Sequence, residues 1–274
     1  IIGMNFENLR HGVTTNGDGD GMPHRVTVTG CTVVSGTLAG LDTHAAGDDI
    51  IFSGNVLEGC GITVRSHGTT VVGNHIRNPQ ANGIMPGDTS PSKDVIVQGN
   101  TIIVPPDPSG ASAIAAGPCT GLTISDNTIL GSGSASNAIT VNSAADKVAI
   151  TGNYIRGWGK GGAGTVAIYA SGSSTGADWL IAKNTLDATG GVASNMMNFG
   201  ATITGLVIVD NIYKGTTSGT GITVPVGTIF RDPYDTATTS HGGTTRKFTT
   251  GAGNTSFSIA NGGTNAISFA TTNG

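Results

Sequence analysis

Charged and aromatic side chains are scarce in this sequence, at 11% and 5% of its 274 residues. So few charges exclude a disordered polyampholyte. The net charge of −4 comes without any cluster of basic residues. This argues against nucleic acid as a partner, because its binding normally requires a basic stripe. Cysteine occurs three times, and this odd count predicts no disulfide framework.

Two kinds of apolar pattern are also missing. No apolar run approaches the ~18 residues that a membrane-spanning helix needs, so insertion into a membrane is not expected. Apolar residues do not recur every ~3.6 positions, which excludes a solenoid built from helices. Glycine, in contrast, accounts for 45 residues, well above its usual share of ~7%. It favours tight corners between short strands.

One eight-residue pattern recurs along the chain, as in Ile50-Ile-Phe-Ser-Gly-Asn-Val-Leu and Val95-Ile-Val-Gln-Gly-Asn-Thr-Ile. Such recurrence is typical of a stacked repeat architecture. Apolar residues alternate with others before the sixth position and shift in parity after it, which indicates a strand that bends there. The residue at this position, here called the anchor, is in turn Cys31, Asn55, Asn74, Asn100, Asn127, Asn153, Asn184 and Asn211.

Asparagine suits a bend because it tolerates left-handed backbone angles, and stacked anchors could bond to one another as a ladder. A second strand follows each anchor, marked in turn by Leu41, Ile62, Ile84, Ile114, Ile139, Ile168, Met197 and Ile222. Since the pattern always returns in the same direction, neighbouring coils are expected to pair in parallel. The sequence therefore predicts an all-β, right-handed parallel β-helix over residues 1–229.

Residues 230–274 lack anchors and are rich in threonine, glycine and serine. Strand-like pieces occur at Arg246-Lys-Phe-Thr-Thr, Ser256-Phe-Ser-Ile and Ala266-Ile-Ser-Phe. We expect a short C-terminal β cap or the start of a further domain, since an open solenoid end exposes strand edges. The coil pattern is already running at Ile2, so the sequence is expected to be a piece of a longer protein. Missing targeting signals then carry no information.

Equivalent positions in successive coils lie side by side, so the register of the second strands brings outward-facing residues together. The ionisable residues that meet in this way are Asp42, His44, Arg65, His67 and Asp88. We predict acid and base roles for Asp42 and Asp88, and proton transfer by His44 and His67. Arg65 would bind a substrate carboxylate. The alternative is a solvated face whose aspartates cap turns.

Other candidates are more isolated. Tyr154, Trp158 and Tyr169 fall in one coil, where they either pack or stack on sugar rings; Tyr154 and Trp158 are the predicted substrate-binding residues. Asn16-Gly-Asp-Gly-Asp-Gly resembles the opening of a calcium loop, but it lacks the acidic ligand expected at the twelfth position. A plain turn is favoured, so no cofactor is expected, with calcium as the open alternative.

Three histidine and arginine residues near the edge of this patch, His11, His24 and Arg25, have no predicted contact. A row three positions after the anchors places Glu58 beside Arg77, most simply as a surface ion pair worth little.

A row of residues four positions before the anchors is half apolar although it faces outward. Its members are Thr27, Ile51, Thr70, Ile96, Thr123, Ala149, Leu180 and Val207. An exposed apolar strip usually marks a partner surface. Either another part of the chain covers the strip or identical rods pack side by side, and we expect association into a symmetric homo-oligomer.

The repeated V-x-I-x-G-N-x-I coils and the Gly/Thr-rich continuation resemble bacteriophage tailspikes and related pectate-lyase-like β-helix proteins that degrade polysaccharides. The similarity covers roughly residues 1–229. It implies a homotrimer that binds and cleaves a bacterial surface polysaccharide, in an extracellular or virion-associated location. The repeats identify architecture better than chemistry.

Gly40-Leu-Asp-Thr-His resembles the Gly-Phe-Asp-Pro-His segment of mannuronan C5-epimerases. This implies that Asp42 and His44 handle the proton at C5 of a uronate while Arg65 or His67 steadies its carboxylate. A threonine replaces the proline, and no tyrosine lies near Asp42 in the sequence, although a tyrosine is an expected acid/base partner. The sequence thus favours a polysaccharide depolymerase, either hydrolase or lyase. The alternatives are an epimerase and a non-catalytic receptor-binding shaft.

Overall fold

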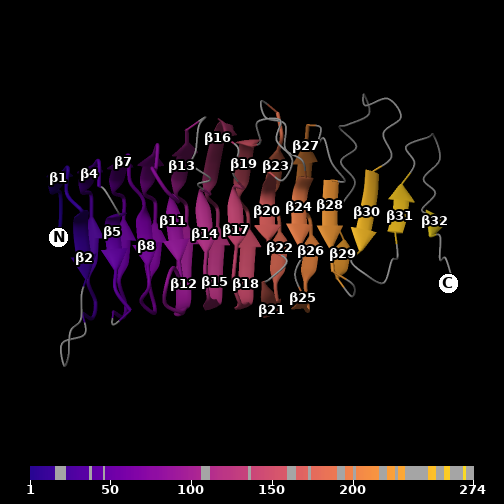
Figure 1. Ribbon diagram of the computed structural model, residues 1–274, viewed down its shortest axis with the longest axis horizontal. Helices are drawn as coiled ribbons and strands as arrows, with labels where there is room; N and C mark the ends of the chain where they lie inside the picture. Colours follow the sequence, from indigo (N-terminus) through magenta and orange to yellow (C-terminus); the bar gives the residue numbers. More distant parts are fainter. Residues whose placement is uncertain are drawn as a thin grey trace.

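The structure is a computed structural model, and its described residues are 1–15, 23–36, 39–45, 47–105, 112–134, 137–158, 165–171, 174–189, 195–199, 202–215, 221–225, 228–231, 246–250, 256–259 and 268–269. Within them the chain forms strands and no helix. The strands stack along a rod that runs from β1 at one end to β32 at the other (Figure 1).

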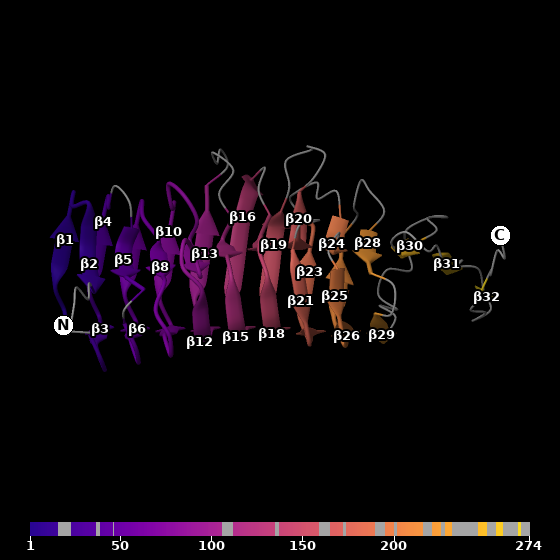
Figure 2. The ribbon, with the colours of Figure 1, turned by 60° about the horizontal axis from the view of Figure 1, so that its bottom comes forward.

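Three long sheets run along the rod, and successive coils each add a strand to all three (Figures 1 and 2). Sheet A consists of β3 (Thr27–Thr29), β6 (Ile51–Ser53), β9 (Thr70–Val72), β12 (Ser92–Gln98), β15 (Cys119–Ser125), β18 (Ala145–Thr151), β22 (Leu180–Ala182), β26 (Val207–Val209) and β29 (Ile229–Arg231). Sheet B consists of β1 (Asn5–Glu7), β4 (Thr32–Val34), β7 (Val56–Glu58), β10 (His75–Arg77), β13 (Thr101–Val104), β16 (Thr128–Ser134), β19 (Tyr154–Trp158), β23 (Thr185–Asp187) and β27 (Ile212–Lys214).

Sheet C extends furthest along the rod. It consists of β2 (His11–Thr15), β5 (Ala39–Thr43), β8 (Ile62–Val64), β11 (Ile84–Pro86), β14 (Ile114–Ala116), β17 (Ile139–Val141), β20 (Val166–Ala170), β24 (Asn195–Phe199), β28 (Gly221–Val224), β30 (Arg246–Thr250), β31 (Ser256–Ile259) and β32 (Ser268–Phe269). A separate pair joins β21 (Thr175–Ala177) to β25 (Thr202–Thr204).

The predicted parallel β-helix and its register are confirmed. Leu41 pairs with Ile62, and Ile62 pairs in turn with Ile84. The markers that continue this row, each paired with the next, are Ile114, Ile139, Ile168, Met197 and Ile222. The distance from anchor to marker varies between 7 and 15 residues, so the period-2 alternation and the apolar marker of each coil specify this register.

Beyond residue 229 the sheets continue. β29 adds to sheet A, and β30 adds to sheet C in parallel. β31 and β32 then pair antiparallel. The first two strand-like pieces predicted here are formed, and the third is limited to Ser268–Phe269. The boundary between a helix domain and a cap stays a prediction.

The interior is a column of aliphatic side chains closed on three sides by the sheets. Val28, Phe52 and Val71 stack in successive coils and are completely buried. Each such side chain stabilises the fold by about 1.5–3 kcal/mol relative to its exposed state. All three cysteines are buried and free, and burial raises the pKa of the Cys119 thiol to about 12.

The anchors form the predicted ladder inside this column. Both the backbone N–H and the side-chain amide of Asn100 donate to Oδ1 of Asn127, at 2.9 Å each. The other amide hydrogen of Asn100 reaches the Val71 carbonyl at 2.9 Å. The same side-chain bond recurs between successive anchors from Asn55 to Asn211. The ladder therefore satisfies buried peptide and amide groups at a corner where the chain leaves the sheets.

The expectation that asparagine itself takes the left-handed angle is wrong. The left-handed residues, with φ of 57° to 67°, stand one position earlier: Gly30, Gly54, Gly73, Gly99, Asp126, Gly152, Lys183 and Asp210. The four glycines before the earlier anchors have open space where a Cβ would lie. The turn therefore points its left-handed residue outward, which leaves the following asparagine free to point inward.

Candidate active site

The candidate site lies on the outer face of sheet C, near the N-terminal end of the rod. In β5, Leu41 packs in the core, and Thr43 Oγ1 accepts hydrogen bonds from the Arg65 backbone N–H and from Ser66 Oγ, both at 2.8 Å. Successive strand residues point to opposite faces. Asp42, between these two inward residues, therefore points outward as predicted.

Asp42 is surrounded by three cationic or titratable side chains. Its Oδ2 lies 3.4 Å from His44 Nε2 and 3.5 Å from His11 Nδ1. Its Oδ1 lies 3.5 Å from Arg65 Nη2. These neighbours cover it so completely that its side chain is 0% exposed. The expected surface carboxylate is thus enclosed, because side chains from the coils before and after it close over it.

Arg65 links Asp42 to the second predicted carboxylate. Its Nε donates to Asp88 Oδ2 at 3.3 Å, so one guanidinium touches both aspartates. The Asp88 side chain is 24% exposed and that of His44 is 40% exposed. We call His11, Asp42, His44, Arg65 and Asp88 the acid–base cluster. Within it, His44 is the group that solvent reaches most freely.

Burial and charge act in opposite directions within the cluster. Burial raises the pKa of Asp42, while Arg65 and then His44 pull it downward. Burial lowers the pKa of His11 from 6.5, against the opposing effect of Asp42. Loss of hydration therefore dominates for both groups, and each neutral form is favoured more than in water.

His67 does not join the acid–base cluster. It forms a backbone bridge with Asp48, on the turn that leads toward sheet A, and no ion contact within the described part of the chain involves it. The sequence spacing predicts that His67 lies with Ser66 at the end of a strand of sheet C, but at His67 the chain has already turned away from that sheet.

The two predicted aromatic binding residues lie elsewhere. Trp158 is 1% exposed and belongs to the core, so its ring cannot stack on a sugar at the surface. This prediction is wrong. Gly157 takes a left-handed φ of 74°, and this breaks the alternation that would have turned Trp158 outward. Tyr154 is half-buried on sheet B, with its hydroxyl 3.5 Å from Asp187 Oδ2.

His11 is the residue of the cluster for which the sequence predicts no contact. Val13 pairs with Leu41, which extends the marker row one coil before the first anchor. Alternation along β2 would place His11 on the same face as Val13, so the sequence does not indicate its contact with Asp42. His11 stands two residues before Val13 and reaches Asp42 from that side.

A shallow hollow of about 140 Å³ continues from Asp88 along the rod. Its lining consists of Asn82, Met85, Asp88, Ala115, Ala116, Gly117, Asn142 and Ser143. The amide and hydroxyl groups here are neutral hydrogen-bonding groups, suited to sugar hydroxyls. The cluster and the hollow together form one extended outer surface of sheet C.

The residues of the calcium-like segment, 16–21, lie outside the described residues. Over the part of the chain that the structure covers, no group of three or more His, Cys, Asp or Glu side chains is placed to hold a metal ion. The same residues contain no helix long and apolar enough to cross a membrane.

A family model described as a right-handed β-helix region matches residues 1–155, more than half of the chain. The chain belongs to the right-handed β-helix family. The predicted handedness of this β-helix protein agrees with that assignment. The family includes polysaccharide-degrading enzymes but also proteins that are not enzymes, so membership alone does not decide the activity.

A search of the curated proteins found no match to this β-helix protein. Among solved structures, it is similar to full-length QnrB1, a plasmid-mediated fluoroquinolone resistance protein, with 12% identity and a TM-score of 0.21. That alignment covers 67% of this chain and 93% of the other. A likeness this slight carries no argument about function.

Proposed function

We propose that this β-helix protein binds and cleaves an acidic bacterial surface polysaccharide at the acid–base cluster. The observation that carries the proposal is the contact of a buried aspartate with an exposed histidine, beside an arginine that touches both aspartates. Proton transfer by a positioned histidine and charge neutralisation by a guanidinium are the two functions that acidic-sugar chemistry requires.

The complete burial of Asp42 supports a different role for it. A fully buried carboxylate cannot touch a sugar ring, so Asp42 acts as a positioning residue that holds His44 and Arg65. His44 carries the proton, as the Asp–His pairing in other acid–base sites would lead one to expect. Asp88 remains the second titratable group within reach of a ligand.

Arg65 keeps donors for a substrate. A guanidinium has five N–H groups, and the contacts with Asp42 and Asp88 use Nη2 and Nε. The remaining Nη1 and the outer Nη2 hydrogen can reach the carboxylate of a uronic acid. Binding that carboxylate withdraws charge from the sugar and makes its C5 proton easier to remove.

The cluster favours elimination over hydrolysis. Hydrolysis by two carboxylates requires both to face the glycosidic bond, whereas only Asp88 is accessible. In elimination His44 removes the C5 proton, the C4–C5 double bond forms, and the C4–O bond breaks as the leaving oxygen gains a proton. A polysaccharide lyase is therefore the preferred form of depolymerase.

A C5-epimerase is the second candidate. The observation that favours it is the direct contact of Asp42 with His44 within the Gly40-Leu-Asp-Thr-His segment. Its first step is the same proton removal, after which the proton returns from the opposite face and the chain stays intact.

We further propose that the protein assembles as a homotrimer at an extracellular or virion-associated location. The support is the outward row of sheet A, which pairs in the expected register from Thr27 to Ile229. Ile51, Ile96 and Leu180 are each 39% exposed in this row, and a contact between copies would remove them from water.

Incubation of the purified protein with acidic capsular polysaccharides tests the proposal. Elimination gives new chain ends together with a rise in absorbance near the ultraviolet edge. New reducing ends without that rise would identify a hydrolase, and C5 proton exchange without shortening would identify an epimerase. Binding without any chemical change would favour the non-catalytic shaft and refute the catalytic proposal.

A further inference from the structure

A second hollow lies on sheet B, where two strands depart from regular pairing. Leu130 pairs with Arg156, but the next pair is Ser134 with Trp158, so β16 contains extra residues opposite β19. Bulges of this kind often lie next to binding sites because they open or redirect the sheet surface. A hollow of about 300 Å³ lies at this point, lined by Leu130, Gly131, Arg156, Gly157 and Thr189.

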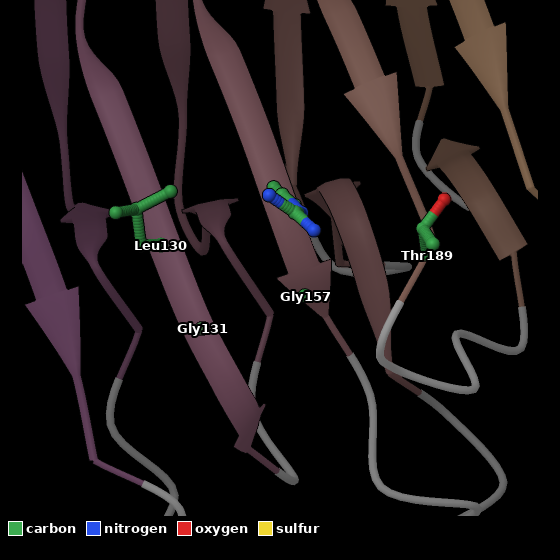
Figure 3. Close-up of a pocket in the computed structure, with 5 residues that line it drawn as sticks. Leu130, Gly131, Gly157 and Thr189 are labelled. Carbon is green, nitrogen blue, oxygen red and sulfur yellow. The ribbon is translucent and has the colours of Figure 1, made fainter.

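The floor of this hollow is bare backbone. Gly157 is left-handed, and a Cβ on it would overlap the Gly131 carbonyl oxygen. A Cβ on Gly131 would lie 3.0 Å from the ring of Trp158. Trp158 therefore lies directly beneath the hollow. Figure 3 shows Leu130 on one side, Thr189 on the other and Gly157 between them.

The rim carries an exposed cation, Arg156. No hydrogen bond or ion pair found among the described residues uses the Arg156 guanidinium, and its side chain is exposed. Asp187 stands beside it in register, followed by Lys214. Oδ1 of Asp187 accepts the Thr189 N–H at 2.8 Å, and this carboxylate also interacts electrostatically with Arg156 and Lys214. The row of Arg156, Asp187 and Lys214 thus presents a net positive charge.

We propose that this hollow is a second saccharide site that holds one acidic pyranose unit. Its volume is at the lower end of the ~300–1,000 Å³ typical of ligand pockets, which suits one ring. Leu130 offers apolar surface to the C–H face of a sugar. Arg156 offers a bidentate partner for its carboxylate, and the Thr189 hydroxyl can bond a ring hydroxyl.

The site is independent of the acid–base cluster. It belongs to β16, β19 and the end of β23 on sheet B, whereas the cluster belongs to β2, β5, β8 and the end of β11 on sheet C. The two share no residue. Binding here therefore needs no cleavage chemistry, and the proposal can fail or hold whatever the activity of the cluster.

Glucuronate and glucose are matched probes, since they differ by the carboxylate. The readout is the indole N–H resonance of Trp158 in ¹⁵N–¹H spectra, identified with Trp158→Phe; the chain has two tryptophans. Millimolar glucuronate should shift this resonance in a saturable way, and glucose about tenfold more weakly. Arg156→Gln should weaken the binding of glucuronate about tenfold, and Leu130→Ala should weaken the binding of both sugars.

Arg77→Gln is the matched control, because Arg77 occupies the same outward row of sheet B. It should bind glucuronate like the wild type, and so should His44→Ala. The proposal is overturned if glucuronate gives no saturable shift, or if Arg156→Gln titrates like the wild type. The proposal is also overturned if Arg77→Gln weakens glucuronate binding as much as Arg156→Gln does, or if His44→Ala abolishes that binding. The same holds if inorganic phosphate shifts the Trp158 resonance as glucuronate does.

Discussion

Asp42 combines an outward position with complete burial, and its role depends on that combination. Alternation in β5 predicts the direction of its side chain, and this part could be derived from the sequence. Its enclosure depends on His11, 31 residues earlier, and on Arg65 in the following coil. No local pattern indicates how far those side chains fold over it. The change from acid–base residue to positioning residue therefore needed the structure.

Asp42→Asn tests this role. Activity should fall by about 10²–10⁴-fold, the usual contribution of a positioned proton-transfer group, while the free energy of unfolding at neutral pH falls by no more than about 1 kcal/mol. The reason is that burial raises the pKa of Asp42, so its ionised form is not what holds the fold together. Urea unfolding beside an activity assay measures both.

The sign of the pH effect follows from the raised pKa. A group with a raised folded pKa contributes stability below its unfolded value, near 3.8, and loses that contribution as the pH rises through the folded value. As the pH rises through the folded pKa of Asp42, the free energy of unfolding of the wild type should therefore fall relative to that of Asp42→Asn. A variant destabilised by about 3 kcal/mol at neutral pH would instead indicate a structural ion pair.

His11 should give the opposite pH dependence. Burial lowers its pKa below 6.5, so between the folded value and 6.5 the unfolded chain binds more protons and stability increases with pH. His11→Asn removes this titrating imidazole, so the free energy of unfolding should depend less on pH in the variant. Urea unfolding between pH 7.5 and about 5 measures this dependence. His75→Asn on sheet B is the control. Equal slopes for His11→Asn and the wild type would contradict the assignment.

Among the elements, the strand register was predictable and the corner geometry was not. The distance from anchor to marker varies between 7 and 15 residues, yet the apolar marker of each coil identifies which residues pair, and sheet C follows these markers from Leu41 to Ile222. The left-handed residue could not be located by propensity, since both glycine and asparagine accept that conformation. At β19 the left-handed Gly157 also changes the parity of the strand, which is why Trp158 packs inward.

Asn127→Ala should destabilise the fold by about 2–4 kcal/mol. The change removes the Oδ1 acceptor of both Asn100 donors, and it removes the amide that bonds to Asn153. Each buried donor left unpaired costs about 1–3 kcal/mol. Thr128→Ala, next in sequence and half-buried outside, should cost less than about 1 kcal/mol. If chemical unfolding shows that Asn127→Ala lowers the free energy of unfolding by less than about 1 kcal/mol, the ladder adds little to stability.

For the whole molecule, the outward face of sheet A sets the expected association. Solution molar mass from light scattering should be three times the 27.2 kDa of the chain. Ile96→Lys should shift it toward the monomer, because it places a charge in the middle of the apolar row. Thr101→Lys, on the outer face of sheet B, should leave it unchanged. A wild-type monomer at micromolar concentration would contradict the trimer.

The central claim is that His44 removes a proton from an acidic polysaccharide bound beside Arg65. Its most direct test is the ultraviolet absorbance of a polyuronate during incubation with the wild type, His44→Ala and His75→Ala. The wild type and His75→Ala should give the same rise, and His44→Ala should be slower by at least about 10²-fold. An undiminished rise with His44→Ala would contradict the claim.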